Sequence, residues 1–387
     1  MSIYLDNSAT TKVRPEVLEA MLPFLQDKFG NPSSIHAKGR EARAAMDKAR
    51  QETAELIGCE PNEIYFASCG TLANNVALLG RARFVEANGL NRNLVVSAIE
   101  HPSVTGPAQY LESSGFKVTY LPVDKAGIVD LDKLEKALRE GASMVSIMWA
   151  NNEIGTVEPM QTICQLVQDE AKRQGREIFH HSDSVQVIGK LKVDMKELPL
   201  SAISFSGHKF GAPKGIGALF LRRLVNVMPI IFGGGQEMGL MPGTEPLANI
   251  VALGEAARLA RLEQAEAEER LRRYQKRLLA AVKDLGGVEI TGPQELELRL
   301  PGHLSICAEG YEGEALVMKG DLKGLAVSSG SACHRGIIEP SAVLKAIGLS
   351  HDKAMGSLRI SLGKDTTEAD VERACTILGG MFKVKQR

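Results

Sequence analysis

The sequence predicts an α/β fold, with a mainly parallel seven-stranded sheet, flanking helices and a smaller α+β domain. Short apolar runs alternate with helical patterns through the first two thirds of the chain. This alternation is typical of a parallel sheet that helices cover on both faces. The last third mixes short strand patterns with two further helical patterns, which indicates the second, smaller domain.

Seven apolar runs have the length of buried strands. They lie at residues 63–67, 93–97, 117–121, 144–149, 177–181, 202–205 and 216–221. Helical patterns between several of them lie at residues 71–86, 131–139 and 160–174. Because ligands bind at the carboxyl ends of the strands in such sheets, the polar residues after these strands are the first candidates for a functional site.

A long helix is predicted at residues 248–284, and its richness in Glu and Arg indicates a solvated face on a connecting helix. The strand and helix patterns after it lie at residues 288–291, 304–307, 312–319, 325–328, 357–361 and 367–383. At about 150 residues per domain, a chain of 387 residues suggests two domains. We place the large domain at residues 15–260 and the small domain at residues 1–14 and 261–387.

The charge balance and the apolar pattern narrow the class of protein. The 46 basic and 47 acidic residues leave a net charge of −1, which argues against direct nucleic-acid binding because that normally needs a basic excess. No apolar stretch approaches the length of about 18 residues that crosses a membrane, so no membrane association is expected. The first residues lack the basic and apolar regions of a secretory signal, and we therefore expect a cytoplasmic protein.

The cysteines of such a protein are expected to be reduced, and most buried thiols are inert. No two cysteines form a C-x-x-C pair, so we expect no metal site made locally by this chain. The six cysteines are Cys59, Cys69, Cys164, Cys307, Cys333 and Cys375.

A lysine follows the predicted strand at 202–205, in the polar turn Ser206-Gly207-His208-Lys209. A Schiff base needs a positioned and partly desolvated amine, and this turn could supply one. A surface lysine in a tight turn is the alternative, and the motif alone leaves both open.

Two further motifs match the needs of pyridoxal phosphate. Asp183 follows the predicted strand at 177–181, and this cofactor needs an anion beside its pyridine nitrogen so that the ring stays protonated. The turn Ser68-Cys69-Gly70-Thr71 places small residues and a hydroxyl at a predicted helix N-terminus, which suits a phosphate group. A plain helix cap is the alternative for this turn.

Polar residues also follow two other predicted strands. His101 comes after the strand at 93–97 and could stack on an aromatic cofactor or move protons. Residues 151–155, Asn-Asn-Glu-Ile-Gly, come after the strand at 144–149 and offer amides for a cofactor oxygen or a substrate carboxylate. Four strand ends thus carry groups that one cofactor requires, and this coincidence is more specific than any single motif.

With these motifs the sequence resembles the cysteine desulfurases of the NifS/IscS type, which are fold-type I pyridoxal-phosphate enzymes of the class-V aminotransferase superfamily. The resemblance covers nearly the whole chain. Its motifs lie at residues 4–11, 29–33, 151–155, 206–209, 213–217, 328–333 and 359–363. The cofactor motifs alone also fit aminotransferases, whereas the run Ser-Ser-Gly-Ser-Ala-Cys at 328–333 is the part that discriminates. In this family it carries the nucleophilic cysteine on a mobile loop.

The resemblance implies roles around the cofactor ring. Lys209 holds the cofactor as a Schiff base and, once released by L-cysteine, moves the protons of the substrate. Asp183 pairs with the pyridine nitrogen, Gln186 contacts the ring hydroxyl, and His101 stacks on the ring and assists acid–base steps. Asn152 contacts the cofactor and, together with Arg359, binds the substrate carboxylate, which the planar fork of an arginine accepts with two hydrogen bonds.

The resemblance also implies a phosphate site and a homodimer, because one phosphate contact comes from the partner subunit. The residues implied at the phosphate are Gly70, Thr71, Ser206 and His208, with Thr244 reaching it from the partner subunit.

Cys333 is the implied sulfur acceptor within the chain. Its thiolate attacks the sulfur of L-cysteine, which leaves a persulfide on the enzyme and releases L-alanine. The basic neighbours His334 and Arg335 favour the thiolate form. The sulfur then passes to an acceptor protein that docks near the Cys333 loop, in iron–sulfur assembly, tRNA thiolation or DNA phosphorothioation. A selenocysteine lyase or another class-V aminotransferase remains the alternative.

Three positions depart from the family pattern. Leu72 stands where an acidic residue is usual, Phe232 where many members have histidine, and Met241 where arginine is common. These departures bear on the edge of the dimer and on the choice of acceptor, whereas the residues of the core chemistry are retained. Cys69, beside the phosphate turn, is expected to be a packed thiol.

Overall fold

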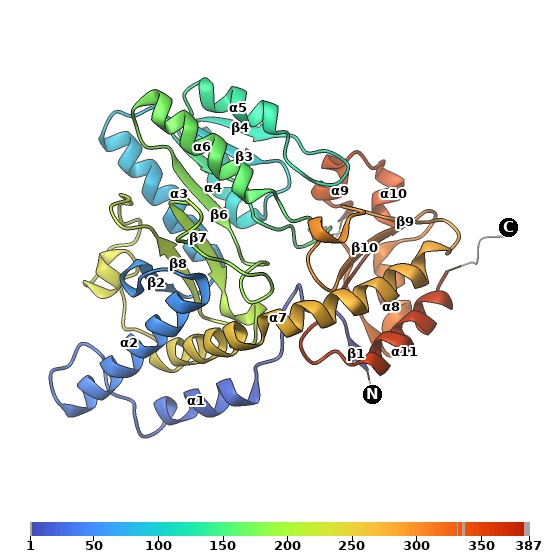
Figure 1. Cartoon of the computed structure of the whole chain (residues 1–387), viewed down its shortest axis with the longest axis horizontal. Coiled ribbons are helices and arrows are strands. Elements are labelled where there is room, and N and C mark those ends of the chain that lie inside the picture. Colours follow the sequence, from blue (N-terminus) through green and yellow to red (C-terminus); the bar gives the residue numbers. More distant parts are fainter. Residues whose placement is uncertain (1, 331, 335–336, 383–387) are drawn as a thin grey trace.

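The computed structural model describes residues 2–330, 332–334 and 337–382, with the backbone alone for residues 332–334 and 337–338. A seven-stranded sheet forms its centre, in the order β2-β8-β7-β6-β5-β3-β4 (Figure 1). The strands are β2 (Ile64–Ala67), β3 (Asn93–Ser97), β4 (Lys117–Leu121), β5 (Met144–Ser146), β6 (Phe179–Asp183), β7 (Ala202–Ser206) and β8 (Gly217–Leu221). These are the seven apolar runs of the sequence, and the predicted α/β fold class is confirmed.

Most of this sheet is parallel, because the strands β4, β3, β5, β6 and β7 run parallel to one another. The exception is β8, which lies antiparallel between β7 and β2. Every residue of β6, β7 and β8 is buried, which explains why these runs are continuously apolar or small instead of alternating. The parallel register brings the carboxyl ends of β3, β5, β6 and β7 to the same edge.

Helices cover both faces of the sheet (Figure 1). On one face, α3 (Gly70–Ala87) and α4 (Pro102–Ser113) share a hydrophobic cluster with the sheet. On the other face lie α1 (Pro15–Leu25), α2 (Ala37–Ile57), α5 (Leu131–Arg139), α6 (Met160–Gln174) and the first half of α7 (Leu247–Lys283). Gly58 and Gly175 end α2 and α6 in the left-handed conformation, with φ of 67° and 64°.

The last third of the chain forms three small sheets. The antiparallel sheet β14-β10-β9 comprises β9 (Val288–Ile290), β10 (His303–Ala308) and β14 (Ser357–Ser361). A parallel pair joins β1 (Ile3–Tyr4) to β11 (Leu325–Ala326), and an antiparallel pair joins β12 (Ala332–His334) to β13 (Ile337–Glu339). Helices α8 (Gly313–Leu322), α9 (Ala342–Ala346), α10 (His351–Met355) and α11 (Glu368–Gly379) complete this part.

The N-terminal residues pack with the C-terminal third. Ile3 and Leu5 share a hydrophobic cluster with Leu278 of α7 and Leu378 of α11. Helix α7 runs from the large sheet to this cluster as one continuous helix (Figure 1), so the predicted domain boundary near residue 260 falls inside it. The division into residues 15–260 and the remainder therefore stays a prediction.

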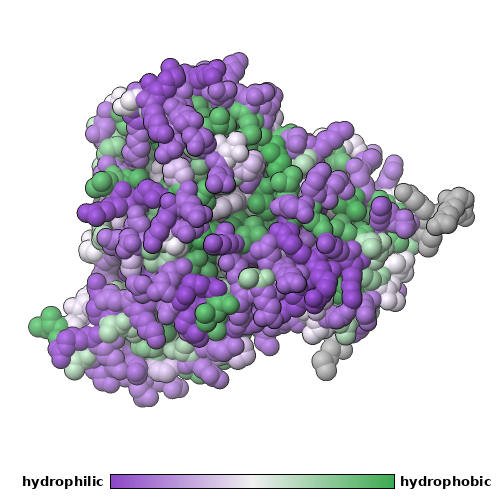
Figure 2. Space-filling view, in the orientation of Figure 1, coloured by the Kyte–Doolittle hydropathy of each residue, from purple (hydrophilic) through white to green (hydrophobic). Residues whose placement is uncertain are grey.

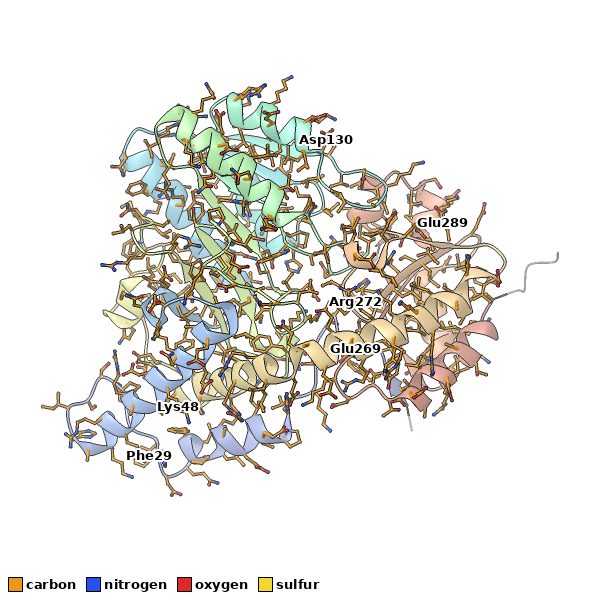
Figure 3. All side chains as sticks on the ribbon, in the orientation of Figure 1. Phe29, Lys48, Asp130, Glu269, Arg272 and Glu289 are labelled. Carbon is orange, nitrogen blue, oxygen red and sulfur yellow. The ribbon has the colours of Figure 1, made fainter. Side chains whose placement is uncertain are left out.

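The outer side of α7 is solvated, as its charge pattern indicated. Its exposed Glu269 and half-buried Arg272 are labelled in Figure 3, and hydrophilic side chains cover most of the same view in Figure 2. Among the described residues, no helix is both long and apolar enough to cross a membrane.

Close packing between α2 and α7 depends on a glycine. A Cβ added to Gly254 would lie 2.5 Å from the Cα of Ala49. We expect Gly254→Ala to destabilise the protein by about 1–3 kcal/mol, because two backbones must move apart. The control is Gly379→Ala at the end of α11, where an added Cβ meets nothing within 4 Å. This change should instead stabilise by about 0.5–1 kcal/mol. Urea denaturation measures both, and equal effects would contradict the packing argument.

Candidate functional site

One cavity of about 300 Å³ lies at the carboxyl ends of β3, β5, β6 and β7. It brings together groups that are far apart in the sequence but follow neighbouring strands. The predicted site residues that line it are Gly70, Thr71, His101, Asn152, Asp183, Gln186, Ser206, His208 and Lys209. Their roles stay predictions, whereas their proximity is a fact of the fold.

Lys209 ends a short 3-10 turn directly after β7 (Gly207–Lys209). Its Nζ donates to the backbone carbonyls of Ser8 at 2.7 Å and Ala9 at 2.8 Å. The N-terminal segment thus holds the amine in place without neutralising it, since both acceptors are uncharged. Of the two readings of this lysine, the fold favours a positioned amine beside a cavity over a free surface lysine.

The surroundings of Lys209 favour its neutral amine. Burial, followed by the positive charge of Arg359, lowers the pKa of Lys209 to about 8, although Asp183 and Asp6 act in the opposite direction. At pH 7 about one lysine in ten is then neutral, which is far more than at the ordinary pKa of such a group. The site therefore supplies a nucleophilic amine near neutral pH.

Asp183 ends β6 and is 4% exposed. One carboxylate oxygen accepts a hydrogen bond from Asn74 Nδ2 at 2.8 Å, and the other accepts one from the backbone N–H of Val185 at 3.0 Å. These two donors fix the orientation of the carboxylate at the wall of the cavity. The arrangement suits a carboxylate that receives a charged N–H from a bound ring.

His101 is the N-cap of α4, and its ring faces the cavity from the end of β3. Its Nδ1 lies 2.7 Å from Ser103 Oγ and accepts a hydrogen bond from the backbone N–H of Ser103 at 3.1 Å. Desolvation by the surrounding protein lowers the pKa of His101, and Lys209 adds to this while Asp183 opposes it. The ring is therefore mainly neutral at pH 7, which suits stacking on an aromatic cofactor.

The candidate phosphate site is the N-terminus of α3, which begins at Gly70. A Cβ added to Gly70 would lie 2.9 Å from Val185 Cγ2, so any larger residue would require Val185 to move. Helix N–H groups with a positive dipole end attract phosphate. His208 borders the same cavity, and its Nδ1 lies 3.1 Å from Thr10 Oγ1. Burial lowers the pKa of His208 to about 4, so this ring can serve as a neutral hydrogen-bonding partner.

Gln186 joins the cavity to a second lysine. Its Nε2 donates to the Ser8 carbonyl at 3.0 Å, and its Oε1 accepts from Lys190 Nζ at 2.6 Å. The same Ser8 carbonyl also accepts from Lys209. Burial, together with the charges of Lys209 and Arg359, lowers the pKa of Lys190 to about 7.

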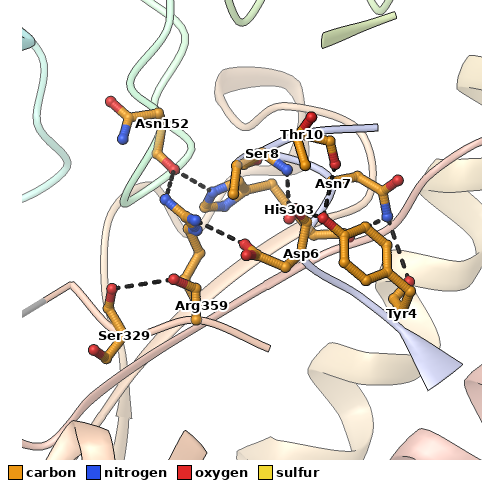
Figure 4. Close-up of polar contacts among 12 residues, drawn as sticks. Tyr4, Asp6, Asn7, Ser8, Thr10, Asn152, His303, Ser329 and Arg359 are labelled. Carbon is orange, nitrogen blue, oxygen red and sulfur yellow. Dashed lines mark hydrogen bonds and ion pairs between the residues drawn. The ribbon is translucent and has the colours of Figure 1, made fainter. Parts of the chain in front are cut away.

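Arg359 lies on β14, beside the cavity but not among the residues that line it. Figure 4 shows its guanidinium between two partners. Its Nη2 donates to Asp6 Oδ1 at 2.8 Å, and its Nη1 donates to the backbone carbonyl of Asn152 at 3.2 Å. His303 Nε2 lies 3.2 Å from the same carbonyl. The backbone of Asn152 therefore joins the cavity wall to the predicted substrate arginine.

Two other predicted residues come from other parts of the chain. Thr244 is exposed and does not line it, as expected of a residue that would act in a partner subunit. Cys333 has its backbone in β12, paired with Ile338 of β13. A loop was expected there, and the described backbone is a two-stranded ribbon, which the β-branched Ile337 and Ile338 favour. The side chain of Cys333 lies outside the described residues.

Sequence reasoning missed the residues that hold the catalytic candidates in place. Asn74, inside α3, donates to both Asp183 and Ser103 Oγ. Asp6 binds Arg359. The family motif at residues 4–11 contains Asp6, but it did not indicate what Asp6 does. Cys69, expected to be a packed thiol, instead caps α3 by accepting from Leu72 N–H at 3.5 Å and lines the cavity.

Several of the other cysteines are poor nucleophiles. Burial raises the pKa of Cys164 and Cys307 to about 12 and raises that of Cys59 even further. Burial also raises the pKa of the half-buried Cys375. The thiolate is the reactive form, so these four thiols are largely unreactive at neutral pH.

Comparison with known proteins identifies the family. Residues 3–374 match the family described as aminotransferase class-V. The chain belongs to the aminotransferase class-V family. The cysteine desulfurase IscS of Dictyoglomus turgidum is 43% identical to it over 377 residues, which cover 97% of this chain and 93% of that protein.

Two solved structures are also similar to this chain. A structure titled NifS-like protein has a TM-score of 0.90 and 37% identity, and the match covers 98% of this chain and 99% of that one. The structure titled SspA in complex with cysteine has a TM-score of 0.79 and 32% identity, with 94% and 99% covered. The predicted resemblance to NifS/IscS-type enzymes is confirmed.

Pyridoxal phosphate, the cofactor of this family, fits the residues of the cavity. Lys209 would hold it covalently, the buried carboxylate of Asp183 would face its ring nitrogen, and the N-terminus of α3 would receive its phosphate. Gly70 has no side chain, and a Cβ there would meet Val185. The N–H groups at the start of α3 therefore stay accessible to a phosphate group. The cofactor predicted from the sequence is confirmed with the family.

The lowered pKa of Lys209 predicts the pH dependence of cofactor uptake. The neutral amine reacts, and its fraction rises until the pH passes the pKa of about 8. We expect the rate at which cofactor-free protein turns yellow with pyridoxal phosphate to rise up to about pH 9 and then level off. Lys209→Ala should not form the yellow species. A rate that keeps rising to about pH 11, as for an ordinary lysine, would contradict the lowered pKa.

Proposed function

We propose that this protein is a pyridoxal-phosphate-dependent cysteine desulfurase in which Cys333 takes the sulfur of L-cysteine. The predicted desulfurase activity is confirmed by a full-length relative that bears this name. The observation that carries the assignment of roles is the single cavity that holds Lys209, Asp183 and the N-terminus of α3. L-alanine is the second product.

The residues of the chain divide the work around the cofactor. When bound, pyridoxal phosphate supplies an electron sink for the bonds that change at the substrate. With the cofactor bound, Asp183 would keep the ring nitrogen protonated, and His101 would stack on the ring as a neutral imidazole. Lys209, once its amine is free, takes and returns the substrate proton, which its pKa of about 8 suits near neutral pH.

The sulfur step needs a thiolate and a held substrate. Arg359 and Asn152 bind the carboxylate of L-cysteine, which is the partner that an arginine fork suits. The Cys333 thiolate then forms a bond to the substrate sulfur, and the carbon–sulfur bond breaks. The released electron pair stays on the substrate carbon, which takes up a proton and becomes the methyl group of L-alanine. The chain keeps the persulfide on Cys333.

The protein works as a homodimer in this proposal. Thr244 is exposed and lies outside its own cavity, so it can reach the phosphate of the partner subunit. Several large apolar side chains are exposed near it and near the connection between α1 and α2, and they are typical of a surface that another subunit covers. They are Phe29 at 72% exposure, Ile35 at 91%, Phe232 at 75% and Met238 at 63%.

The persulfide passes to an acceptor protein that docks near the Cys333 ribbon, within the cytoplasm. The ribbon is a separate two-stranded sheet in the C-terminal third of the chain, and we propose that the acceptor protein binds at this ribbon. Iron–sulfur assembly, tRNA thiolation and DNA phosphorothioation all use such a donor, and the near-neutral net charge of −1 favours a protein acceptor over direct contact with nucleic acid.

Substitution of Cys333 tests the proposal. With L-cysteine and a reductant, Cys333→Ser should release sulfide at least about 100-fold more slowly than the wild type, because no thiolate remains to attack. The control Cys375→Ser removes a half-buried thiol and should leave the rate unchanged. Alanine and sulfide are quantified together, and the persulfide is located by mass spectrometry.

An undiminished rate in Cys333→Ser would show that another group takes the sulfur. Transfer of the amino group to an added keto acid, without alanine and sulfide from L-cysteine, would establish an aminotransferase instead. Turnover on selenocysteine with none on cysteine would establish a selenocysteine lyase.

A further inference from the structure

Side-chain hydrogen bonds of Asn151 hold the turn at residues 151–155 in its conformation. Asn151 is 1% exposed, and its Oδ1 accepts hydrogen bonds from the backbone N–H groups of Glu153 at 2.8 Å and Ile154 at 3.0 Å. Its Nδ2 donates to the carbonyl of Ile99 at 3.1 Å, next to His101. Asn151 thus fixes the backbone of Glu153 relative to the segment that carries Ile99 and His101.

The carboxyl group of Glu153 binds one end of the segment that carries Cys333 and lies beside the other end. Its Oε2 accepts a hydrogen bond from Ser341 Oγ. A Cβ added to Gly330 would lie 3.1 Å from the same oxygen. Gly330 precedes Cys333 by three residues and Ser341 follows it by eight, so one carboxyl group lies between the two stems of the β12-β13 ribbon.

Each stem has a second attachment. The backbone N–H of Gly330 donates to Ser357 Oγ at 3.0 Å. The hydroxyl of Ser341 caps α9 by accepting from Val343 N–H at 3.1 Å and Leu344 N–H at 3.3 Å. The oxygen of the Ser341 hydroxyl thus accepts two hydrogen bonds, and its one hydrogen is donated to Glu153, so its full hydrogen-bonding capacity is used.

The same turn holds the predicted substrate arginine. The carbonyl of Asn152, the residue before Glu153, accepts from Arg359 Nη1 at 3.2 Å. The backbone of Arg359 pairs in both directions with Ser328, at 2.7 and 3.2 Å, two residues before Gly330. One turn of five residues thus touches the arginine and both stems of the ribbon.

We propose that Glu153 is a positioning residue for sulfur transfer: on the turn that also holds Arg359, it holds Ser341 at one end of the segment 330–341 and lies beside Gly330 at the other. In this proposal the turn at 151–155 sets the distance between the bound substrate and the thiol of Cys333, because it binds both the substrate arginine and the base of the Cys333 segment. This inference rests on the proposed function, in which Cys333 accepts the sulfur.

The hydrogen bond requires an acceptor at Glu153, not a full negative charge. Burial raises the pKa of Glu153, whereas Ser341 and the charge of Arg359 lower it. A carboxyl group in either protonation state can accept from the Ser341 hydroxyl, and so can the amide oxygen of glutamine. Glutamine is therefore the conservative replacement, and alanine removes the acceptor.

The test separates positioning from cofactor chemistry. Glu153→Ala should slow persulfide formation on Cys333 in a single turnover by about 10- to 100-fold, the size of effect expected from misplacing a reacting group. The spectral change of the bound cofactor on adding L-cysteine should keep its wild-type rate. Glu153→Gln should restore persulfide formation to within about threefold of the wild type, because it retains the acceptor.

A second pair of variants tests the same contact from the other side. Ser341→Ala removes the donor to Glu153 and the cap of α9. Ser350→Ala removes the cap of the neighbouring five-residue helix α10 without touching Glu153. We expect Ser341→Ala, but not Ser350→Ala, to slow persulfide formation, and to add little when combined with Glu153→Ala.

A readout without turnover completes the test. The rate at which iodoacetamide alkylates Cys333, followed by peptide mass spectrometry, should change in Glu153→Ala and return toward the wild type in Glu153→Gln. The inference is overturned if Glu153→Ala leaves both persulfide formation and alkylation unchanged, or if it slows the cofactor step as much as the sulfur step. Failure of the proposed function is distinct, since wild-type protein would then place no sulfur on Cys333.

Discussion

The carbonyl of Ser8 is the point on which the rest of the site depends. It accepts from Lys209 Nζ and from Gln186 Nε2, while the N–H of Ser8 donates to Ser361 Oγ at 2.8 Å. Two residues earlier, Asp6 pairs with Arg359. The N-terminal segment therefore lies between the large sheet and the C-terminal third and fixes the lysine of one against the arginine of the other.

This arrangement explains the electrostatics of the site. Lys209, Lys190 and Arg359 are cations close enough to lower the pKa values of the two lysines, and backbone carbonyls hold Lys209 instead of a carboxylate. A direct ion pair would stabilise the charged amine and remove its nucleophilicity. Uncharged acceptors orient the amine while burial keeps its pKa near neutrality, which is the combination a Schiff-base lysine needs.

The sequence predicted the parts of the fold and site that depend on local pattern. The seven strands are short apolar runs, and the polar residues after them, such as Asp183 and His101, gather because parallel strands end at one edge. Ser8 could not be found in this way, since it acts through its backbone carbonyl and any residue has one. Asn74 lies within α3, where its side chain resembles that of any polar helical residue until the fold brings it to Asp183.

The segment that carries Cys333 can be held at its ends and still deliver sulfur to a second protein. Ser341 at one end is hydrogen-bonded to Glu153 and Gly330 at the other end is hydrogen-bonded to Ser357, and ten residues lie between them. The two strands of the ribbon have three residues each, so each spans roughly 10 Å at 3.3 Å per residue. A support at Glu153 acts on Ser341, eight residues after Cys333, so in this proposal it constrains the base of the segment and not the residue that delivers the sulfur. Fixing the stems also limits the entropy lost when the thiol meets the substrate.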